Sequence, residues 1–211
     1  MNHGPLLFLG VLATLAASWL GLVAVPRHQL APLNADLSTN AANVVVTYPL
    51  ARSGEAAQGH QLYVAHGCVA CHTQQVRPAH GGSDLARGWG QRRSVARDYL
   101  RDTPVQLGTS RLGPDLANYG ERLGTNSFNL VRLFNPRLVV TNSTCAGVPF
   151  LFQTRTSVGG GPSPDALAIP SANGTEVFPT TAVRQLAAYL ASLSTSAELP
   201  EAPLPAKEEA K

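Results

Sequence analysis

The chain has 211 residues, of which 14% are charged, and its formal net charge is +3. This length suits one small domain with appended segments better than a set of large domains. The excess of positive charge is too small to indicate a nucleic-acid-binding protein, although a weakly basic face suits an anionic membrane surface or an acidic partner.

The first predicted element is a membrane-spanning helix. No charged residue occurs from Gly4 to Pro26, and the run from Leu6 to Val25 is almost wholly apolar. A helix of that length crosses a hydrocarbon layer of about 30 Å. A cleaved signal peptide is the alternative, but the residues before this run include no Lys or Arg, and the apolar core of a signal peptide is shorter. We therefore predict a single-pass transmembrane anchor over residues 1–26.

An extended connector and a second helix follow the anchor. Residues 27–53 are rich in Pro, Asn, Ala and Thr and show no helical period. A helix is expected to begin at Ser53 or Gly54 and to end at Gly67, because serine caps helix starts and glycine ends helices. We expect its apolar contacts from Ala57, Leu62, Tyr63 and Val64.

Directly after this helix, residues 68–72 read Cys-Val-Ala-Cys-His, which is the C-x-x-C-H signature of c-type haem attachment. Two thiols at this spacing reach different vinyl groups of one porphyrin, and the adjacent imidazole binds iron as the proximal ligand. A zinc site is the alternative, but it needs two further Cys or His ligands at matched spacing, and only Cys145 remains. The motif predicts one haem c, bound covalently through Cys68 and Cys71, with His72 as its iron ligand.

The haem motif also predicts the orientation of the anchor. The charges that flank the apolar run do not decide it, since Arg27 stands on one side and the other side has no charge. Covalent haem attachment takes place outside the cytoplasmic membrane. We therefore expect a bacterial inner-membrane protein whose soluble part faces the periplasm.

A turn further along the chain is expected to support the haem ligand. Residues 113–116 read Gly-Pro-Asp-Leu, and Pro114 has no amide proton, so its carbonyl is free to accept a hydrogen bond. In class I cytochromes c such a carbonyl orients the proximal imidazole, and we expect Pro114 to accept the Nδ1 proton of His72. A plain turn is the alternative. Candidates to hold the haem propionates are Arg77, Trp89, Tyr99 and Arg111.

A last helix and a tail close the chain. The spacing of apolar residues predicts a helix from about Thr181 to Leu193 with Thr180 or Thr181 as its cap. We predict a disordered tail over residues 194–211, which hold several prolines and a Lys/Glu run. The fold is expected to be mainly α: a transmembrane helix, then a class I cytochrome c-like domain over residues 54–193 with long loops, including an insertion over about residues 153–179.

Several segments together resemble one family. Their order along the chain is similar to that in the membrane-anchored mono-haem subunit II of cbb3-type cytochrome c oxidases, and the likeness covers about residues 3–193. The segments are 67–78 (GCVACHTQQVRP), 87–90 (RGWG), 96–99 (ARDY), 111–116 (RLGPDL), 135–137 (NPR) and 149–152 (PFLF).

The resemblance implies an electron-transfer subunit of a respiratory terminal oxidase. Its partners would be the haem-copper catalytic subunit, which reduces oxygen, and a further c-type cytochrome subunit. The chain itself is then expected to carry out no bond chemistry. Two alternatives stay open at this point: a haem-based gas sensor, and a stand-alone anchored cytochrome c that transfers electrons.

One position departs from the family pattern. The family's sixth iron ligand is a methionine within a Ser-x-Met-Pro stretch, whereas residues 143–146 here read Ser-Thr-Cys-Ala, and the only methionine is Met1. Three arrangements of the sixth iron position remain: ligation by a Cys145 thiolate, ligation by another group such as His80 or His66, or an open site. We favour Cys145, because it stands at the ligand position and a metal-bound thiol is readily deprotonated.

Overall fold

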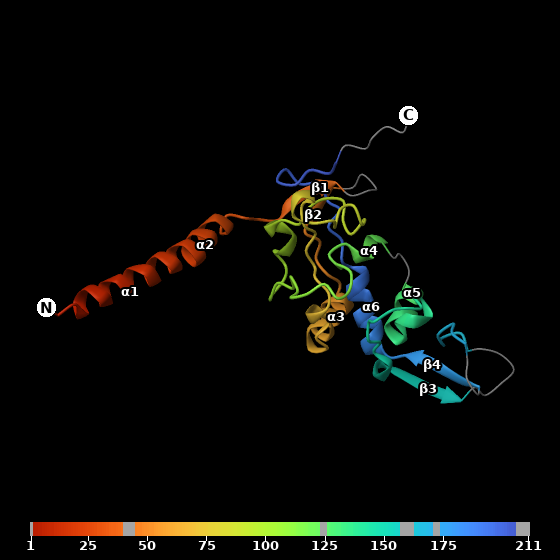
Figure 1. Ribbon diagram of the computed structural model, residues 1–211. Helices are drawn as coiled ribbons and strands as arrows, with labels where there is room; N and C mark the ends of the chain where they lie inside the picture. Colours follow the sequence, from red (N-terminus) through yellow and green to blue (C-terminus); the bar gives the residue numbers. More distant parts are fainter. Residues whose placement is uncertain (1, 40–44, 123–125, 157–162, 171–173, 206–211) are drawn as a thin grey trace. The chain divides into compact units, whose positions relative to one another are not determined.

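The computed structural model begins with a continuous helix of 27 residues from Gly4 to Leu30 (Figure 1). It consists of α1 (Gly4–Trp19), the π-helical turn η1 (Leu20–Ala24) and α2 (Val25–Leu30). The helix is long and apolar enough to cross a membrane. The predicted transmembrane segment is therefore present as a helix.

The helix continues past Pro26, where it was predicted to end. The amide of Val25 donates to the carbonyl of Leu20, five residues earlier, so the turn before the proline is wider than an α-helical turn. Proline lacks an amide proton and its ring crowds the carbonyl four residues before it. The wider turn makes room for the ring, and the helix continues to Leu30 rather than ending at the predicted boundary.

The structure describes residues 2–39, 45–122, 126–156, 163–170 and 174–205. The chain divides into two compact units, Met1–Asp36 and Leu37–Lys211, and the regular structure of the second unit is more helix than strand. Its α-helices are α3 (Gly54–Ala65), α4 (Tyr119–Arg122), α5 (Asn126–Phe134) and α6 (Thr181–Ala191), and the strands are β1 (Asp36–Thr39), β2 (Val45–Tyr48), β3 (Phe152–Thr156) and β4 (Thr175–Pro179). Short 3-10 turns occupy parts of the long loops.

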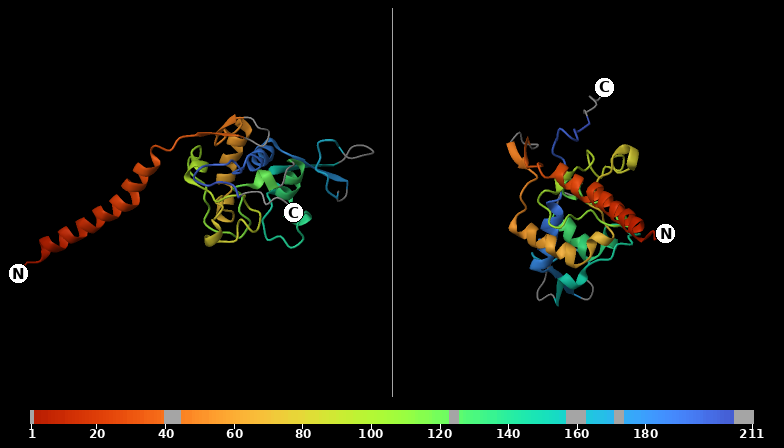
Figure 2. Two further views of the ribbon diagram at one scale, coloured as in Figure 1. Left: turned by 90° about the horizontal axis from the view of Figure 1, so that it is seen from above. Right: turned by 90° about the vertical axis from the view of Figure 1, so that its left-hand side faces the viewer.

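The two predicted helices of the soluble unit begin at the expected caps. The Ser53 hydroxyl accepts a hydrogen bond from the amide of Ala56 at 3.2 Å, and the Thr180 hydroxyl accepts one from the amide of Val183 at 3.5 Å. Such side chains satisfy amides that have no partner within the helix. Helices α3 and α6, far apart in the sequence, pack against each other (Figures 1 and 2).

A glycine permits this close helix packing. A Cβ atom built at Gly59 in α3 would lie 1.9 Å from the carbonyl oxygen of Gln185 in α6, and 2.8 Å from Cβ of Tyr189. No side chain larger than hydrogen fits at this contact. The backbones of α3 and α6 therefore approach each other at Gly59.

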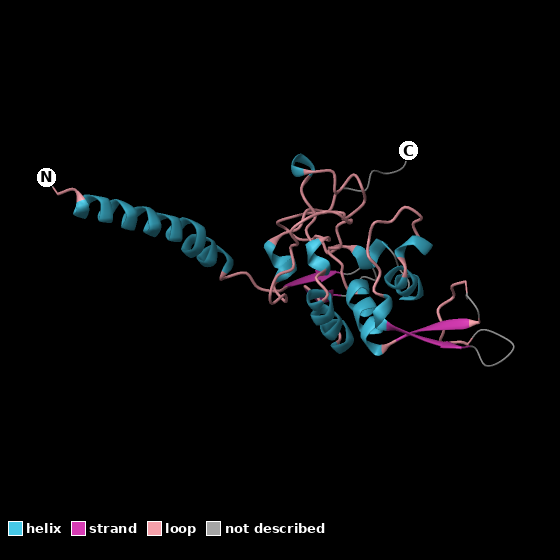
Figure 3. Ribbon diagram, turned by 60° about the horizontal axis from the view of Figure 1, so that its bottom comes forward, coloured by secondary structure: helices cyan, strands magenta, loops and turns pink. Residues whose placement is uncertain are grey.

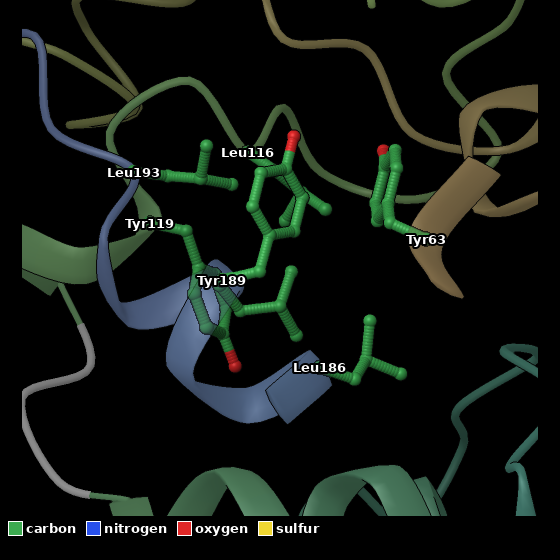
Figure 4. Packing of buried hydrophobic residues seen from close by; sticks show 7 residues of the cluster. Tyr63, Leu116, Tyr119, Leu186, Tyr189 and Leu193 are labelled. Carbon is green, nitrogen blue, oxygen red and sulfur yellow. The ribbon is translucent and has the colours of Figure 1, made fainter. Parts of the chain in front are cut away.

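The core between these helices is rich in tyrosine. Tyr63 of α3 faces Tyr189 of α6 with 5.2 Å between the ring centroids, and Leu116 and Tyr119 join them from the loop before α4 and from α4 (Figure 4). Two of the apolar contacts predicted for α3 are wrong, because Ala57 and Val64 are exposed, whereas Ala56 is buried. The buried side chains of α3 contact α6, whose own buried residues include Val183, Leu186 and Leu190.

A β-hairpin occupies the predicted loop insertion. Strands β3 and β4 pair antiparallel with Thr154 opposite Val177, and β4 leads directly into α6 (Figure 3). Val177 and Phe152 are buried with Val183 and Ala187 of α6. The hairpin thus shares a hydrophobic core with α6, while residues 157–162 and 171–173 of the insertion lie outside the described residues.

The first part of the predicted disordered tail is packed instead. Leu199 and Ala202 are buried, and the amide of Thr195 donates to the side chain of Asn118 at 3.0 Å. The carbonyl of Ala197 accepts a hydrogen bond from Arg92 at 2.6 Å. Composition pointed to disorder, but two apolar side chains and these polar contacts suffice to fix residues 194–205; residues 206–211 lie outside the described part.

Candidate functional site

The three residues of the predicted haem motif lie directly after α3. Gly67 ends the helix with a φ angle of 67°, a left-handed conformation that favours glycine. The 3-10 turn η2 (Cys68–Ala70) follows, and the amide of His72 donates to the carbonyl of Cys68 at 3.0 Å. This compact turn holds both cysteines and the histidine within one short segment. Both thiols are free, with Cys68 half-buried and Cys71 exposed.

The imidazole of His72 meets the turn that the sequence singled out. Its Nδ1 lies 2.9 Å from the carbonyl oxygen of Pro114. A Cβ atom at Gly113 would lie 2.2 Å from Cε1 of the ring, so only glycine allows this backbone to reach the imidazole. With the proton on Nδ1, this contact is a hydrogen bond from the ring to the carbonyl. The other ring nitrogen, Nε2, makes no hydrogen bond within the described part of the chain.

Backbone hydrogen bonds hold the two segments together. The amide of Gly113 donates to the carbonyl of Cys71 at 3.0 Å, and the amide of Leu116 donates to the carbonyl of Thr73 at 2.7 Å. These bonds flank the contact between His72 and Pro114 on both sides. The position of Pro114 relative to the imidazole is thus set by the backbone as well as by the ring.

Cys145 lies in the loop between η5 (Pro136–Leu138) and η6 (Pro149–Leu151). The loop is tied to the end of α5, because the amide of Val148 donates to the carbonyl of Leu133 at 2.7 Å and Gly147 packs against the carbonyl of Phe134. The residue as a whole is exposed, whereas its thiol is partly buried and lies close enough to Cys71 and Arg132 for their charges to affect its pKa.

Burial raises the pKa of the Cys145 thiol, and the Cys71 thiolate acts in the same direction. The Arg132 guanidinium opposes both effects and lowers the pKa. The structure therefore places this third thiol and a positive charge near the Cys-x-x-Cys-His segment.

The two histidines weighed as alternatives have other surroundings. The His66 ring packs edge-on against Phe150, with 5.3 Å between the centroids, and His80 is exposed in the 3-10 turn η3 (Ala79–Gly81). Phe150 itself is 67% exposed, and Leu112, which precedes Gly113, is 78% exposed. Large apolar side chains thus stand exposed beside both the cysteine turn and the Pro114 turn, as a binding site for an apolar group requires.

Two of the predicted propionate contacts share one buried carboxylate. Asp84 is fully buried and pairs with Arg77 at 3.1 Å and with Arg111 at 2.5 Å. The Arg111 guanidinium also lies 5.7 Å from the ring centroid of Trp89, and the Arg87 guanidinium lies 4.9 Å from it. Arg77, Arg111 and Trp89 therefore form one cluster, which the structure builds around Asp84.

Tyr99 stands in a different arrangement. Its hydroxyl donates to the backbone carbonyl of Gln74 at 2.8 Å. A tyrosine has a single hydroxyl proton. In this structure Tyr99 uses it to hold the segment after His72, so its side chain has no proton left for a propionate.

One arginine in the arginine-rich segment 87–101 lies in the interior. Of the five arginines from Arg87 to Arg101, Arg92 is only 3% exposed and pairs with Asp98 at 2.8 Å. A charge buried this completely needs a partner of opposite charge. Arg92 therefore belongs to the interior, and it cannot serve a partner-facing surface.

Sequence reasoning missed two buried aspartates that organise the site. Asp84 gathers the arginine cluster, and Asp115, which follows Pro114, accepts a hydrogen bond from Thr73 at 2.6 Å. A signal for Asp115 was present, because it lies inside the Gly-Pro-Asp-Leu segment already singled out. No local pattern marks Asp84, since its partners come from residues 77 and 111.

A comparison with known protein families identifies the family of the chain. Residues 6–163 match the family model described as FixO, the mono-haem subunit of cytochrome c oxidase. No curated protein matches the chain. The match covers most of the chain, including the haem motif, the Pro114 turn and Cys145, although it ends before the last part of the likeness expected from sequence. The chain therefore belongs to the FixO family: it is a mono-haem electron-transfer subunit of cytochrome c oxidase with an N-terminal membrane helix.

Proposed function

We propose that this chain binds one haem c covalently through Cys68 and Cys71, with His72 as the proximal iron ligand. The single observation that carries the proposal is the contact of His72 Nδ1 with the Pro114 carbonyl at 2.9 Å, directly after a Cys-x-x-Cys turn. The residues fit the group: two free thiols and an imidazole at the required spacing, beside exposed apolar side chains. When bound, the haem supplies a one-electron carrier.

The Pro114 carbonyl fixes the form of the His72 ring. By accepting a hydrogen bond from Nδ1–H, the carbonyl selects the tautomer whose Nε2 carries no proton. A neutral histidine in this form can bind a metal through Nε2. Gly113 packs on the ring and limits its rotation. The chain thus prepares the ligand atom in the absence of any other partner.

Arg77, Arg111 and Trp89 are proposed to hold the haem propionates. Asp84 keeps the two guanidinium groups together, and each retains donors beyond those it uses on Asp84. Arginine suits this role because its planar fork of N–H groups binds carboxylates. Tyr99 would support the same region indirectly, through the carbonyl of Gln74.

Cys145 is proposed as the sixth iron ligand in place of the family's methionine. Its loop is anchored to α5, and the thiol lies close enough to Cys71 and Arg132 for their charges to affect its pKa. A thiolate ligand stabilises ferric iron better than a neutral thioether does, because its negative charge offsets the ferric charge. We expect a haem potential below that of a His/Met cytochrome of the same fold.

Within the oxidase, the soluble unit is proposed to pass electrons to the haem-copper catalytic subunit, which reduces oxygen. The partner set would include this subunit and a further c-type cytochrome subunit. The helix Gly4–Leu30 would anchor the chain in the bacterial inner membrane, with the haem in the periplasm. Family membership and the membrane helix support this arrangement.

Two experiments test the proposal. A tagged chain is purified in mild detergent from its host and examined for a co-purifying haem-copper subunit; a haem-loaded chain that repeatedly purifies alone would contradict the partner assignment and favour a stand-alone cytochrome or gas sensor. For the sixth ligand, the ferric EPR spectrum is recorded for wild type, Cys145→Ser and Cys145→Met. We expect low-spin thiolate signals in the wild type only, and identical spectra in all three would remove Cys145 from the iron.

A further inference from the structure

We propose that Thr73 and Asp115 act as a positioning pair for the proximal histidine, an inference that rests on the proposed haem function. Thr73 follows His72, and Asp115 follows Pro114, so each member of the pair is covalently next to one partner of the imidazole contact. The Thr73 hydroxyl donates to Asp115 Oδ2 at 2.6 Å. The side-chain bond thus runs beside the hydrogen bond between the imidazole and the carbonyl.

The carboxylate of Asp115 is fully buried, which calls for an explanation. Burying a charge is unfavourable unless donors replace the lost water. The amide of Gln75 donates to Oδ2 at 2.7 Å, the amide of Ala117 donates to Oδ1 at 2.9 Å, and the Arg111 guanidinium lies 3.7 Å from Oδ2. Together with Thr73, these groups surround the carboxylate with donors.

The donors come from both segments that hold the site. Thr73 and Gln75 belong to the segment after the haem motif, whereas Ala117 and Arg111 belong to the segment around Pro114. Asp115 therefore cross-links the two segments at their point of contact. Thr73 directly follows His72, and Asp115 directly follows Pro114. Any lengthening of the bond between Thr73 and Asp115 therefore changes the distance between His72 Nδ1 and the Pro114 carbonyl.

The backbone around Thr73 leaves little freedom to compensate. A Cβ atom at Gly108 would lie 2.6 Å from Cα of Thr73 and 2.6 Å from the carbonyl oxygen of His72, so the loop at Gly108 packs closely against this segment. The Tyr99 hydroxyl holds the next carbonyl, that of Gln74. Segment 72–75 is therefore fixed from several directions, and the Thr73 hydroxyl and the Gln75 amide both bond it directly to Asp115.

The chemical consequence concerns the iron ligand. A strong hydrogen bond from Nδ1 increases the electron density on the imidazole and makes it a better ligand for ferric iron. The pair keeps that hydrogen bond short. Without the Thr73 hydroxyl, Asp115 loses one of its donors, the Pro114 turn relaxes and the bond from Nδ1 weakens. The ferric form is then less stabilised, and the midpoint potential rises.

The test compares two substitutions at one position in the full, haem-loaded chain in detergent. Thr73→Val removes the hydroxyl and keeps the shape, whereas Thr73→Ser keeps the hydroxyl. We measure the midpoint potential by spectroelectrochemical titration and the free energy of unfolding by denaturant titration. We expect a higher potential for Thr73→Val and a wild-type potential for Thr73→Ser.

A third variant distinguishes an effect on the position of the His72 ring from a general loss of stability. Tyr48→Phe removes a buried hydrogen bond to Asp98, 2.6 Å long, in another part of the same unit. It should lower the stability and leave the potential unchanged. If Thr73→Val does not yield folded protein, Asp115→Asn is measured in its place, with the same expected rise in potential.

The outcomes are distinct. An unchanged potential in Thr73→Val would overturn the positioning pair while the haem function stands, and so would shifts in Thr73→Ser and Tyr48→Phe as large as the shift in Thr73→Val. A wild-type chain that carries no covalent haem would instead overturn the proposed function, and the positioning pair with it.

Discussion

Arg92 and Asp98 form an ion pair at 2.8 Å in which both side chains are only 1% exposed. The Tyr48 hydroxyl donates to Asp98, and Arg92 donates to the carbonyl of Ala197. One buried pair therefore joins the end of the connector, the loop around residue 95 and the C-terminal segment. Removing one charge would leave the other buried without a partner, which is more costly than the pair itself.

The first prediction follows from this pair. Asp98→Ala should lower the free energy of unfolding by about 3–5 kcal/mol, because it strands the buried Arg92 guanidinium. Denaturant titration of the soluble unit within the full chain measures the change. Glu198→Ala, at an exposed position, is the control and should change the stability by less than about 0.5 kcal/mol. Equal stability of the two variants would show that the pair is not buried as described.

The packing of α3 on α6 gives the second prediction. Gly59→Ala places a methyl group 1.9 Å from the carbonyl oxygen of Gln185, so the helices must separate. Overpacking of this kind typically costs about 1–3 kcal/mol. Gly54→Ala is the matched control, since a Cβ there meets no atom within 4 Å. A Gly59→Ala protein with wild-type thermal stability would rule out this close packing.

The third prediction concerns acid stability. Burial acts to raise the pKa of Asp84, but hydrogen bonds from Arg111 and Arg77 outweigh it and lower the pKa from 3.8 to about 2. Because the folded-state pKa is below the unfolded one, the stabilisation is complete above the unfolded value and is lost as the pH falls through the folded value. Its size at neutral pH is about 2 kcal/mol.

Asp84→Asn tests that dependence. The stability difference between wild type and Asp84→Asn should shrink by about 2 kcal/mol as the pH falls from about 5 to about 2, because only the wild type loses this contribution. Unfolding curves at a series of pH values measure it. A difference that stays constant over this range would mean that Asp84 does not hold the arginines as a carboxylate.

The C-terminal segment supplies the fourth prediction. Leu199 is 1% exposed although its surroundings in the sequence are those of a disordered tail. Leu199→Ala should lower the free energy of unfolding by about 2–5 kcal/mol, the usual cost of emptying a buried leucine site. Leu50→Ala, at a side chain that is 60% exposed, serves as the control. If both variants unfold alike, residues 194–205 do not form part of the fold.

Much of the fold was predictable because the signals were local. Ser53 and Thr180 indicated where α3 and α6 begin. The spacing of apolar residues indicated the buried face of α6, and the long apolar run indicated the membrane helix. The end of that helix was not predictable from Pro26, since the π-helical turn before it absorbs the proline. The packing of the segment around Leu199 was missed for a different reason: its residues Thr195 and Ala197 bond to Asn118 and Arg92, which lie far away in the sequence.

In the site, too, residues with a local sequence signal were predictable, whereas contacts between distant residues were not. Cys68, Cys71 and His72 form a contiguous motif, and Pro114 was found through the chemistry of its carbonyl. The arginine cluster around Asp84 depends on residues brought together by loops, which no spacing rule describes. Tyr99 was selected by residue type alone, and only the structure shows that its proton goes to Gln74.

The central claim is that Cys68 and Cys71 hold porphyrin covalently. The most direct measurement is the absorbance of the denatured chain after acid-acetone extraction, following production in a host with working haem-attachment machinery. We predict that the wild-type polypeptide retains the absorbance of one haem, and that a Cys68→Ser, Cys71→Ser double variant retains none. A wild-type polypeptide that keeps no porphyrin absorbance would contradict the account.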